Sequence, residues 1–307
     1  WVRSCPDRFG GMYMKLYTDK MAAHCRRFEE ALPTYLPETG TRQDTVVRAM
    51  TYACTDGGKR IRPVLTMEFC RLCCGDAERA LPFAVGVEMI HSYSLVHDDL
   101  PCMDNSPLRR GKPAAHVAFG EAMALLTGDA LLTRAFEVML AAKDVPADAV
   151  VSAAKTLADA AGILGMVGGQ VIDLESEGKT IDRACLNALQ DGKTAALLRA
   201  ACAMGVIVGG GDAEMAAAAT AFGEHIGLCF QITDDILDVI STAQMMGKPV
   251  GSDAVNEKVT YVSLLGLEEA KKLAAENTAA AIKMLAAFDG DTENLRNLAQ
   301  ALLVRDH

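Results

Sequence analysis

The chain has 307 residues, of which 50% are hydrophobic and only 5% are aromatic. Its core must therefore be built from Ala, Leu, Val, Ile and Met, a composition that favours close packing of helices against one another. A formal net charge of -10 argues against a general binder of nucleic acids or anionic membranes. Any local cluster of Lys and Arg stands out against this background.

The cysteines and the apolar runs bear on the cellular compartment. Cys70, Cys73 and Cys74 form the only tight group of cysteines, and they lack the second ligand pair of a structural zinc site. We interpret them as reduced thiols. Charged residues interrupt the N-terminus where a signal peptide would need an apolar core, and no stretch reaches the roughly 18 uninterrupted apolar residues of a membrane span. These features predict a soluble, cytoplasmic protein without membrane insertion.

Proline placement and helix propensity predict an all-α fold. None of the 10 prolines lies between Pro146 and Pro249, a stretch dominated by Ala, Leu and Met, which are strong helix formers. No linker, repeat or low-complexity tail divides the chain, so we expect one all-α domain over residues 1–307. The predicted helices cover residues 14–36, 41–55, 61–74, 78–100, 117–142, 147–175, 182–208, 213–245, 261–286 and 291–304.

The first candidate site is the turn Asp-Gly-Gly-Lys-Arg-Ile-Arg-Pro at residues 56–63. The two glycines free the backbone for a tight turn, and the proline suits the first turn of the following helix. Lys59, Arg60 and Arg62 crowd a helix start, where the macrodipole already supplies partial positive charge, so an anion is the expected partner. A basic surface turn is the alternative. Arg60, between the other two cations, is placed to point elsewhere and serve the structure.

The second candidate site is the charged segment 96–112, in which three carboxylates precede two adjacent arginines. Clustered carboxylates (Asp98, Asp99 and Asp104) suit Mg²⁺, which usually lies between protein carboxylates and substrate phosphates. Arg109 and Arg110 suit the phosphate, because a guanidinium can bond it through two donors. The alternative is a solvated charged turn between two helices.

The helix before this segment aligns further groups with its acidic end. His91 precedes Asp98 by seven residues and shares nearly the same helix face. Asp104 follows Asp98 by six residues, which on an undisturbed helix would turn it about 120° away. Pro101 argues against an undisturbed helix there. We therefore expect a bulge or helix end around residues 100–103 that swings Asp104 back towards Asp98.

Two further segments combine glycines with polar side chains. Gln170 and Asp173 follow a glycine pair and share one helix face, where they could bond a metal's water shell or form a buried polar pair. Gly192-Lys193-Thr194 starts an apolar helix and again predicts a phosphate ligand. It is not a P-loop, which needs a longer glycine-rich pattern and a preceding strand.

A second acidic cluster lies at residues 231–238. Asp234 and Asp238 are four residues apart on one helix face, and their repulsion within an apolar helix suggests a countering cation. Gln231 lies about one turn earlier, near the same site. Lys248 and Lys258 follow in the next loop as further cations. This second combination of paired carboxylates and lysines argues against a merely solvated face.

The two acidic clusters predict a common chemistry. Carboxylates on separate helices can face each other across a helical bundle and hold several Mg²⁺ ions. A diphosphate bridged between them would be neutralised and become a better leaving group. The apolar helix faces below would hold a hydrocarbon tail. Such a site would ionise an allylic diphosphate to a carbocation, shield it from water, and add an alkene to it.

In order and spacing, these segments resemble the trans-isoprenyl diphosphate synthase family, of the short-chain bacterial farnesyl/geranylgeranyl type. The resemblance runs from about residue 57 to 261. It implies an all-α bundle with a central cavity and a Mg²⁺-dependent condensation of isopentenyl diphosphate with dimethylallyl or geranyl diphosphate. It also implies a homodimer. The matching segments are Gly57–Pro63, Asp98–Asp104 with Leu108–Gly111, Gly169–Gln170 with Asp173, Gly192–Thr194, and Gln231–Asp238 with Lys248 and Lys258.

Carried over by position, the resemblance also implies roles for single residues. About three Mg²⁺ ions would be bound by Asp98, Asp104 and Asp234, with Asp99 and Asp238 in support. The allylic diphosphate would be held by Arg109, Lys193, Lys248 and Lys258. Isopentenyl diphosphate would be held by Lys59, Arg62, His91 and Arg110. Thr194 and Gln231 would place oxygen dipoles near the developing cation, and with Lys193, Asp98 and Asp99 they make up the expected catalytic set. The proton would leave on the released diphosphate, so no side-chain base is expected.

Two local features bear on the product. Ser106-Pro107 stands where the family often continues with acidic residues, which predicts a stiffer and less acidic loop. Tyr93, beside Ser94, occupies the position five residues before the first aspartate, which lines the tail pocket in this family. A bulky aromatic residue there, with the two-residue insertion in the first motif, is similar to farnesyl diphosphate synthases. We therefore expect the fifteen-carbon product, farnesyl diphosphate.

Three other functions are the alternatives. A geranylgeranyl diphosphate synthase would more often carry a smaller or more flexible side chain at position 93. A class I terpene cyclase would need neither the anion turn at Gly57–Pro63 nor a second aspartate cluster. A non-catalytic subunit of a heteromeric prenyl synthase would tend to lose motif residues, whereas both clusters are intact here.

Overall fold

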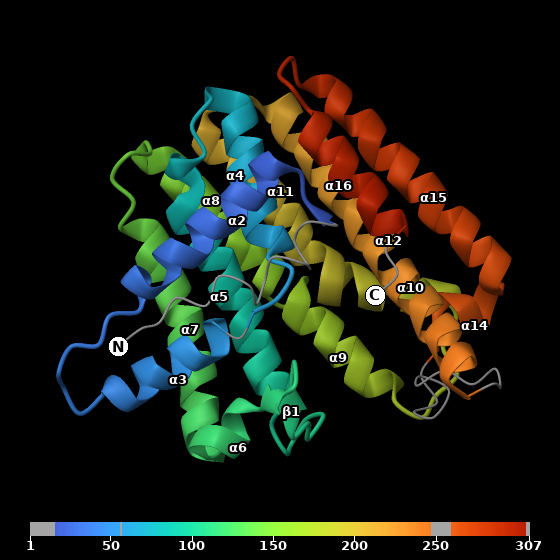
Figure 1. The fold of residues 1–307 in the computed structure, drawn as a ribbon, viewed down its shortest axis with the longest axis horizontal. Helices are drawn as coiled ribbons and strands as arrows, with labels where there is room; N and C mark the ends of the chain where they lie inside the picture. The colour runs from blue at the N-terminus through green and yellow to red at the C-terminus, as the bar shows by residue number, and fades with distance from the viewer. Residues whose placement is uncertain (1–15, 56, 247–258, 305–307) are drawn as a thin grey trace.

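A computed structural model describes residues 16–55, 57–246 and 259–304, with side chains up to residue 240 in the second range. The described residues form a bundle of helices with a single two-stranded hairpin at one end (Figure 1). The prediction of an all-α fold is confirmed.

The elements follow one another with short connections. The α-helices are α2 (Asp19–Ala31), α3 (Asp44–Cys54), α4 (Ile61–Cys74), α5 (Leu81–Asp98), α6 (Ala115–Phe119), α7 (Glu121–Leu140), α8 (Ala147–Ala161), α9 (Met166–Ser176), α10 (Arg183–Gln190), α11 (Ala196–Gly209), α12 (Ala213–Met246), α14 (Tyr261–Leu265), α15 (Leu267–Met284) and α16 (Glu293–Val304). The hairpin pairs β1 (Leu108–Arg109) with β2 (Lys112–Pro113) in antiparallel register. Short 3₁₀ segments lie at Leu32–Tyr35, Glu78–Ala80 and Leu285–Ala287, and a π-helical segment, η3, covers Asp191–Ala195.

Several predicted helices are divided in the structure. The range 147–175 breaks into α8 and α9, because Gly162 and Gly165 leave the helical conformation between them. The range 182–208 contains η3 between α10 and α11. The range 117–142 is divided at Gly120, whose positive φ of 87° separates α6 from α7. Glycine permits such conformations at little cost, and hydrophobic periodicity does not reveal them.

Helix α11 lies at the centre of the bundle, where 12 of its 14 residues are buried. It packs against α4, α8 and α12, while α5 packs against α7 and α4 (Figure 1). The C-terminal α15 and α16 cover the far side of α12. Three aromatic rings meet at this junction: Phe69 of α4 lies 5.5 Å, between ring centroids, from both Phe222 of α12 and Phe288. This arrangement leaves α5, α9 and α12 to frame the cavity described below.

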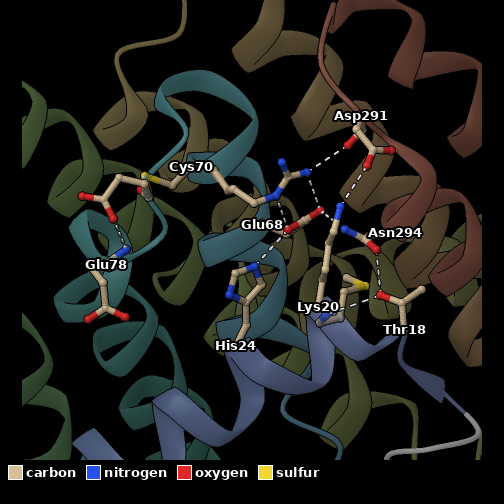
Figure 2. Close-up of polar contacts among 11 residues, drawn as sticks. Thr18, Lys20, His24, Glu68, Cys70, Glu78, Asp291 and Asn294 are labelled. Atoms are coloured by element: carbon tan, nitrogen blue, oxygen red, sulfur yellow. Dashed lines mark hydrogen bonds and ion pairs between the residues drawn. The ribbon is translucent and has the colours of Figure 1, made fainter.

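A polar cluster around Glu68 joins the two ends of the chain to α4 (Figure 2). The fully buried Glu68 carboxylate contacts His24 Nε2 of α2 at 3.0 Å and accepts hydrogen bonds of 2.8 Å from Arg71 and from Asn294 of α16. Burial alone would raise the pKa of Glu68, but the hydrogen bonds from Arg71, His24 and Asn294 lower it to about 2. The carboxylate is therefore charged at neutral pH and ties α2, α4 and α16 together.

Two described stretches are long and apolar enough to cross a membrane, judged by length and composition alone. The most apolar window of Arg183–Gly209 is 78% buried, as expected of a core helix. The corresponding window of Ala147–Ser176 is only 33% buried, and the connection between α8 and α9 exposes Ile163 and Leu164. This second stretch therefore presents an apolar surface that the described residues leave uncovered.

Candidate active site

One cavity of about 930 Å³ collects most of the predicted site residues. Its walls come from the turn before α4, from α5 and the turn after it, and from α7, α9, η3, α11 and α12. The apolar part of the lining includes Leu100, Met166, Leu174 and Leu197. The predicted residues that line it are Lys59, Arg62, His91, Tyr93, Ser94, Asp98, Arg110, Lys193, Thr194 and Gln231.

Arg60 is turned into the protein and gives the anion turn its shape. It has a left-handed backbone conformation, with φ of 50°, at the start of α4. Its buried guanidinium donates hydrogen bonds to Glu29 (2.6 Å), Glu88 (2.7 Å) and the Cys54 carbonyl (2.6 Å). The expectation that Arg60 serves the structure is confirmed. Lys59 and Arg62 of the same turn line the cavity beside Arg60, whose guanidinium is held by these three acceptors.

Positive charge gathers on this wall of the cavity, and one buried donor there lacks a partner among the described residues. Arg62 Nε is buried and has no hydrogen-bond partner among the described residues. Burial lowers the pKa of Arg62. Burial, followed by the charges of Arg62 and Arg110, also lowers the pKa of His91 well below its usual range, so the imidazole is neutral at neutral pH. Lys59 lies over the Phe230 ring, 5.2 Å from its centroid. A buried donor without a partner is costly, and an anionic ligand would satisfy it.

The β1–β2 hairpin sends the two adjacent arginines in different directions. Arg110 and Gly111 form its turn with positive φ values of 52° and 79°, as in the tight turns that join antiparallel strands. Arg110 reaches the cavity and donates to the Gly57 carbonyl. A Cβ atom on Gly58 would lie 2.7 Å from the Arg110 guanidinium, so this approach needs glycine. Arg109 turns the other way and forms a two-point ion pair with the buried Asp99.

The first acidic cluster forms where α5 ends. The helix stops at Asp98, and the turn through Pro101 closes when the Asp104 amide donates to the Asp98 carbonyl oxygen at 2.9 Å. The predicted helix end before Asp104 is confirmed. Burial, with the nearby charge of Asp104, raises the pKa of the Asp98 carboxyl, while Lys193 acts in the opposite direction. Asp99 instead pairs with Arg109, so the three carboxylates have different surroundings.

The opposite wall is built on the π-helical segment η3. Such widened turns occur often at functional sites because they re-aim side chains. Lys193 Nζ lies 2.6 Å from the Asp173 carboxylate of α9, and Thr194 Oγ1 lies 3.4 Å from Gln231 Oε1 of α12. These residues also line an adjoining polar cavity of about 250 Å³, which extends the site beyond Lys193 towards α14.

In the second acidic cluster, as in the first, one aspartate is buried and bonded within the protein while the others are more exposed. Asp234 and Asp238 are partly buried on α12. Asp235 between them is buried and accepts hydrogen bonds from Gln231 Nε2 at 3.2 Å and from the Tyr261 amide at 2.8 Å. Asp235 thereby holds the start of α14 against α12. The predicted Lys248 and Lys258 lie outside the described residues.

The carboxylates fit a metal that is shared with a ligand. In the part of the chain that the structure describes, no group of three or more His, Cys, Asp and Glu side chains is arranged to hold a metal ion by itself. Mg²⁺ usually keeps only one or two carboxylates and completes its octahedron with phosphate oxygens and water. Asp98 with Asp104, and Asp234 with Asp238, would supply such pairs of hard oxygen ligands.

Sequence reasoning missed two contributors to the site. Glu88 lines the cavity and neutralises Arg60. A glutamate within an otherwise apolar helix, three residues before His91, was a signal that could have found it. His97 also lines the cavity, but its role depends on contacts with α7 that no local pattern reveals.

Comparison with known proteins identifies the family. The chain is 45% identical over 262 residues to the farnesyl diphosphate synthase of Geobacillus stearothermophilus, covering 85% of this chain and 88% of that protein. It is 46% identical over 291 residues to geranylgeranyl pyrophosphate synthase 3, chloroplastic, of Arabidopsis thaliana, covering 93% and 79% respectively. The crystal structure of an FPP/GFPP synthase from Zymomonas mobilis, 36% identical, matches with a TM-score of 0.82 and covers 93% of this chain and 98% of that one. Residues 43–301 match the polyprenyl synthetase family, and the chain belongs to that family.

Proposed function

We propose that this chain is a Mg²⁺-dependent prenyltransferase that condenses isopentenyl diphosphate with an allylic diphosphate. The observation that carries the proposal is one cavity lined by both charged and apolar side chains. Arg62, Lys193 and Asp98 line the charged part, while Met166 and Leu197 line the apolar part. This combination suits an amphiphilic substrate with a diphosphate head and a hydrocarbon tail, and it agrees with the family.

Isopentenyl diphosphate would bind at the turn before α4. Lys59, Arg62 and Arg110 supply positive charge there, and the unpartnered Arg62 Nε supplies a donor. The neutral His91 would add a hydrogen bond without further charge. Charge-assisted hydrogen bonds from guanidinium groups are suited to phosphate oxygens. This subsite would hold the alkene towards the carbon that becomes cationic.

The allylic diphosphate would bind between the two acidic clusters. Arg109 and Lys193 would hold its oxygens, together with Lys248 and Lys258, and the first two would loosen their pairs with Asp99 and Asp173 to do so. Asp98 and Asp104 on one side, and Asp234 and Asp238 on the other, would hold about three Mg²⁺ ions. Those ions would neutralise the departing diphosphate.

The remaining chemistry falls to dipoles and to the shape of the cavity. The oxygen atoms of Thr194 and Gln231, 3.4 Å apart, would stabilise the positive charge that develops as the carbon–oxygen bond breaks. The alkene of isopentenyl diphosphate attacks this carbon, and the proton lost afterwards leaves on the released diphosphate. The apolar lining would exclude water from the carbocation.

We propose farnesyl diphosphate as the main product. Tyr93 is 7% exposed and lines the cavity, where its ring would limit the length of the tail, with Ser94 as its neighbour. Geranylgeranyl diphosphate is the alternative, because enzymes with that name are among the similar proteins. Tyr93→Ala is expected to shift the product to twenty carbons. An unchanged fifteen-carbon product would remove Tyr93 as the limit.

Product analysis of the purified chain with isopentenyl and dimethylallyl diphosphates and Mg²⁺ tests the function. A linear fifteen- or twenty-carbon diphosphate supports the proposal. A cyclic hydrocarbon would indicate a terpene cyclase, and no product without a second protein would indicate a non-catalytic subunit. Asp98→Asn should abolish turnover. The matched control is Asp159→Asn, which removes an exposed carboxylate on α8 and should leave turnover intact.

We also propose that one all-α domain over residues 1–307 acts as a cytoplasmic homodimer. The support for a dimer is the apolar surface of α7 to α9, where Leu126, Ile163 and Leu164 are 53%, 82% and 91% exposed. Exposed apolar surfaces of this kind often mark protein–protein contacts. A second copy of the chain would cover it.

A further inference from the structure

His97 belongs to α5, and its side chain extends towards α7 on the side of the cavity that Tyr93 occupies. Its Nε2 atom is 3.0 Å from the Leu125 carbonyl oxygen of α7, and His97, Tyr93 and Leu125 all line the cavity. Helical side chains lean towards the N-terminus of their helix. The His97 ring therefore covers the turn that carries Tyr93, four residues earlier.

Gly128 makes room for this ring on α7. A Cβ atom at position 128 would lie 1.9 Å from His97 Nε2 and 2.3 Å from its Cδ2. Since no real Cβ contact is that short, the imidazole occupies a slot that exists only because residue 128 is glycine. The slot and the hydrogen bond to Leu125 together hold the His97 ring in one orientation.

The fixed imidazole meets the ring of Tyr93. The two ring centroids are 5.7 Å apart and the planes are inclined by 76°, an edge-to-face arrangement that aromatic pairs favour. A tyrosine on a helix has few alternative rotamers. With His97 in the slot, the space beside Tyr93 towards α7 is filled, and the phenol cannot swing into it.

We infer that His97 is a positioning residue that sets product length by holding Tyr93 across the cavity. This inference rests on the proposed function, because it assumes that the growing tail ends against Tyr93. The sequence identifies the Tyr93 phenol as the group that stops the growing tail. The His97 imidazole, which lies against Gly128, keeps that phenol in place. His97 takes no part in breaking or forming bonds.

The experiment compares the products of the wild type, His97→Ala, Tyr93→Ala and the double variant, with isopentenyl and geranyl diphosphates and Mg²⁺. His97→Ala is expected to raise the ratio of twenty-carbon to fifteen-carbon product by about tenfold or more, the scale on which a small change in apolar fit discriminates substrates. In the Tyr93→Ala background, the same substitution should add no further lengthening, because the phenol it positions is gone. A loss of stability alone would lower turnover without changing this ratio.

Two outcomes would overturn the inference. An unchanged product ratio in His97→Ala would show that Tyr93 keeps its position unaided, and equal lengthening in both backgrounds would show that His97 does not act through Tyr93. If His97→Ala does not fold, His97→Asn removes the ring and keeps an amide donor, so the same comparison applies. A wild-type chain that makes no linear prenyl diphosphate would instead refute the proposed function.

Discussion

The buried pair of Arg60 and Glu88 provides the sharpest test of how the anion turn is held. Their side chains are 1% and 3% exposed, and Arg60 Nη1 lies 2.7 Å from Glu88 Oε1. At an effective dielectric constant of about 20, two unit charges at this distance attract by about 6 kcal/mol. Glu88→Gln keeps a hydrogen-bond acceptor of the same shape but removes the charge, while Glu29 remains near the other side of Arg60. We therefore expect about half of that attraction to be lost, or about 3 kcal/mol of unfolding free energy.

Glu29→Gln is the matched control, because Glu29 also bonds Arg60, at 2.6 Å, but its side chain is 31% exposed. Solvent screens such a pair, so this change should cost about 1 kcal/mol. Denaturant titration of both variants measures the difference. Since Arg60 anchors the turn that carries Lys59 and Arg62 to the cavity, Glu88→Gln should also raise the KM for isopentenyl diphosphate more than that for the allylic substrate. A loss of stability no larger than that of Glu29→Gln would refute the reasoning.

Three further changes test the fold, the anion turn and the proposed dimer. The pKa of Glu68 is about 2 in the folded protein against an ordinary 4.5. Its charged form therefore contributes about 3 kcal/mol to the free energy of unfolding, which is present above pH 4.5 and is lost as the pH falls towards 2. Glu68→Gln should flatten this part of a stability–pH curve, and an unchanged slope would contradict the shift. Gly58→Ala should displace Arg110 and raise the KM for isopentenyl diphosphate about tenfold, whereas Gly75→Ala shares the positive φ but meets no atom within 4 Å and should leave this KM unchanged; similar KM values in both variants would argue against the contact. Leu164→Asp should convert a dimer to monomers in sedimentation velocity, and a dimer that persists would place the interface elsewhere.

Local sequence rules predicted the features that depend on near neighbours. Pro101 lacks a backbone N–H and its ring clashes with the preceding helical turn, and α5 ends just before it, at Asp98. As expected, the chain then brings Asp104 back to Asp98. The position of Arg60 between Lys59 and Arg62 correctly indicated that its side chain would serve the structure. The all-α class followed from helix propensity over long stretches, which is a sum of many small local terms.

The tertiary structure decided what depends on residues far apart in the chain. The pairing of Arg60 with Glu88 joins positions 28 residues apart, and His97 meets the α7 carbonyl of Leu125 across the same separation. Neither contact leaves a periodic trace in the sequence, because each is selected by how two helices pack. The sequence by itself therefore determined the all-α class and the order of the charged motifs. Only the packing of α4, α5 and α7 decided which acidic side chain engages Arg60 and which α7 residues the His97 ring contacts.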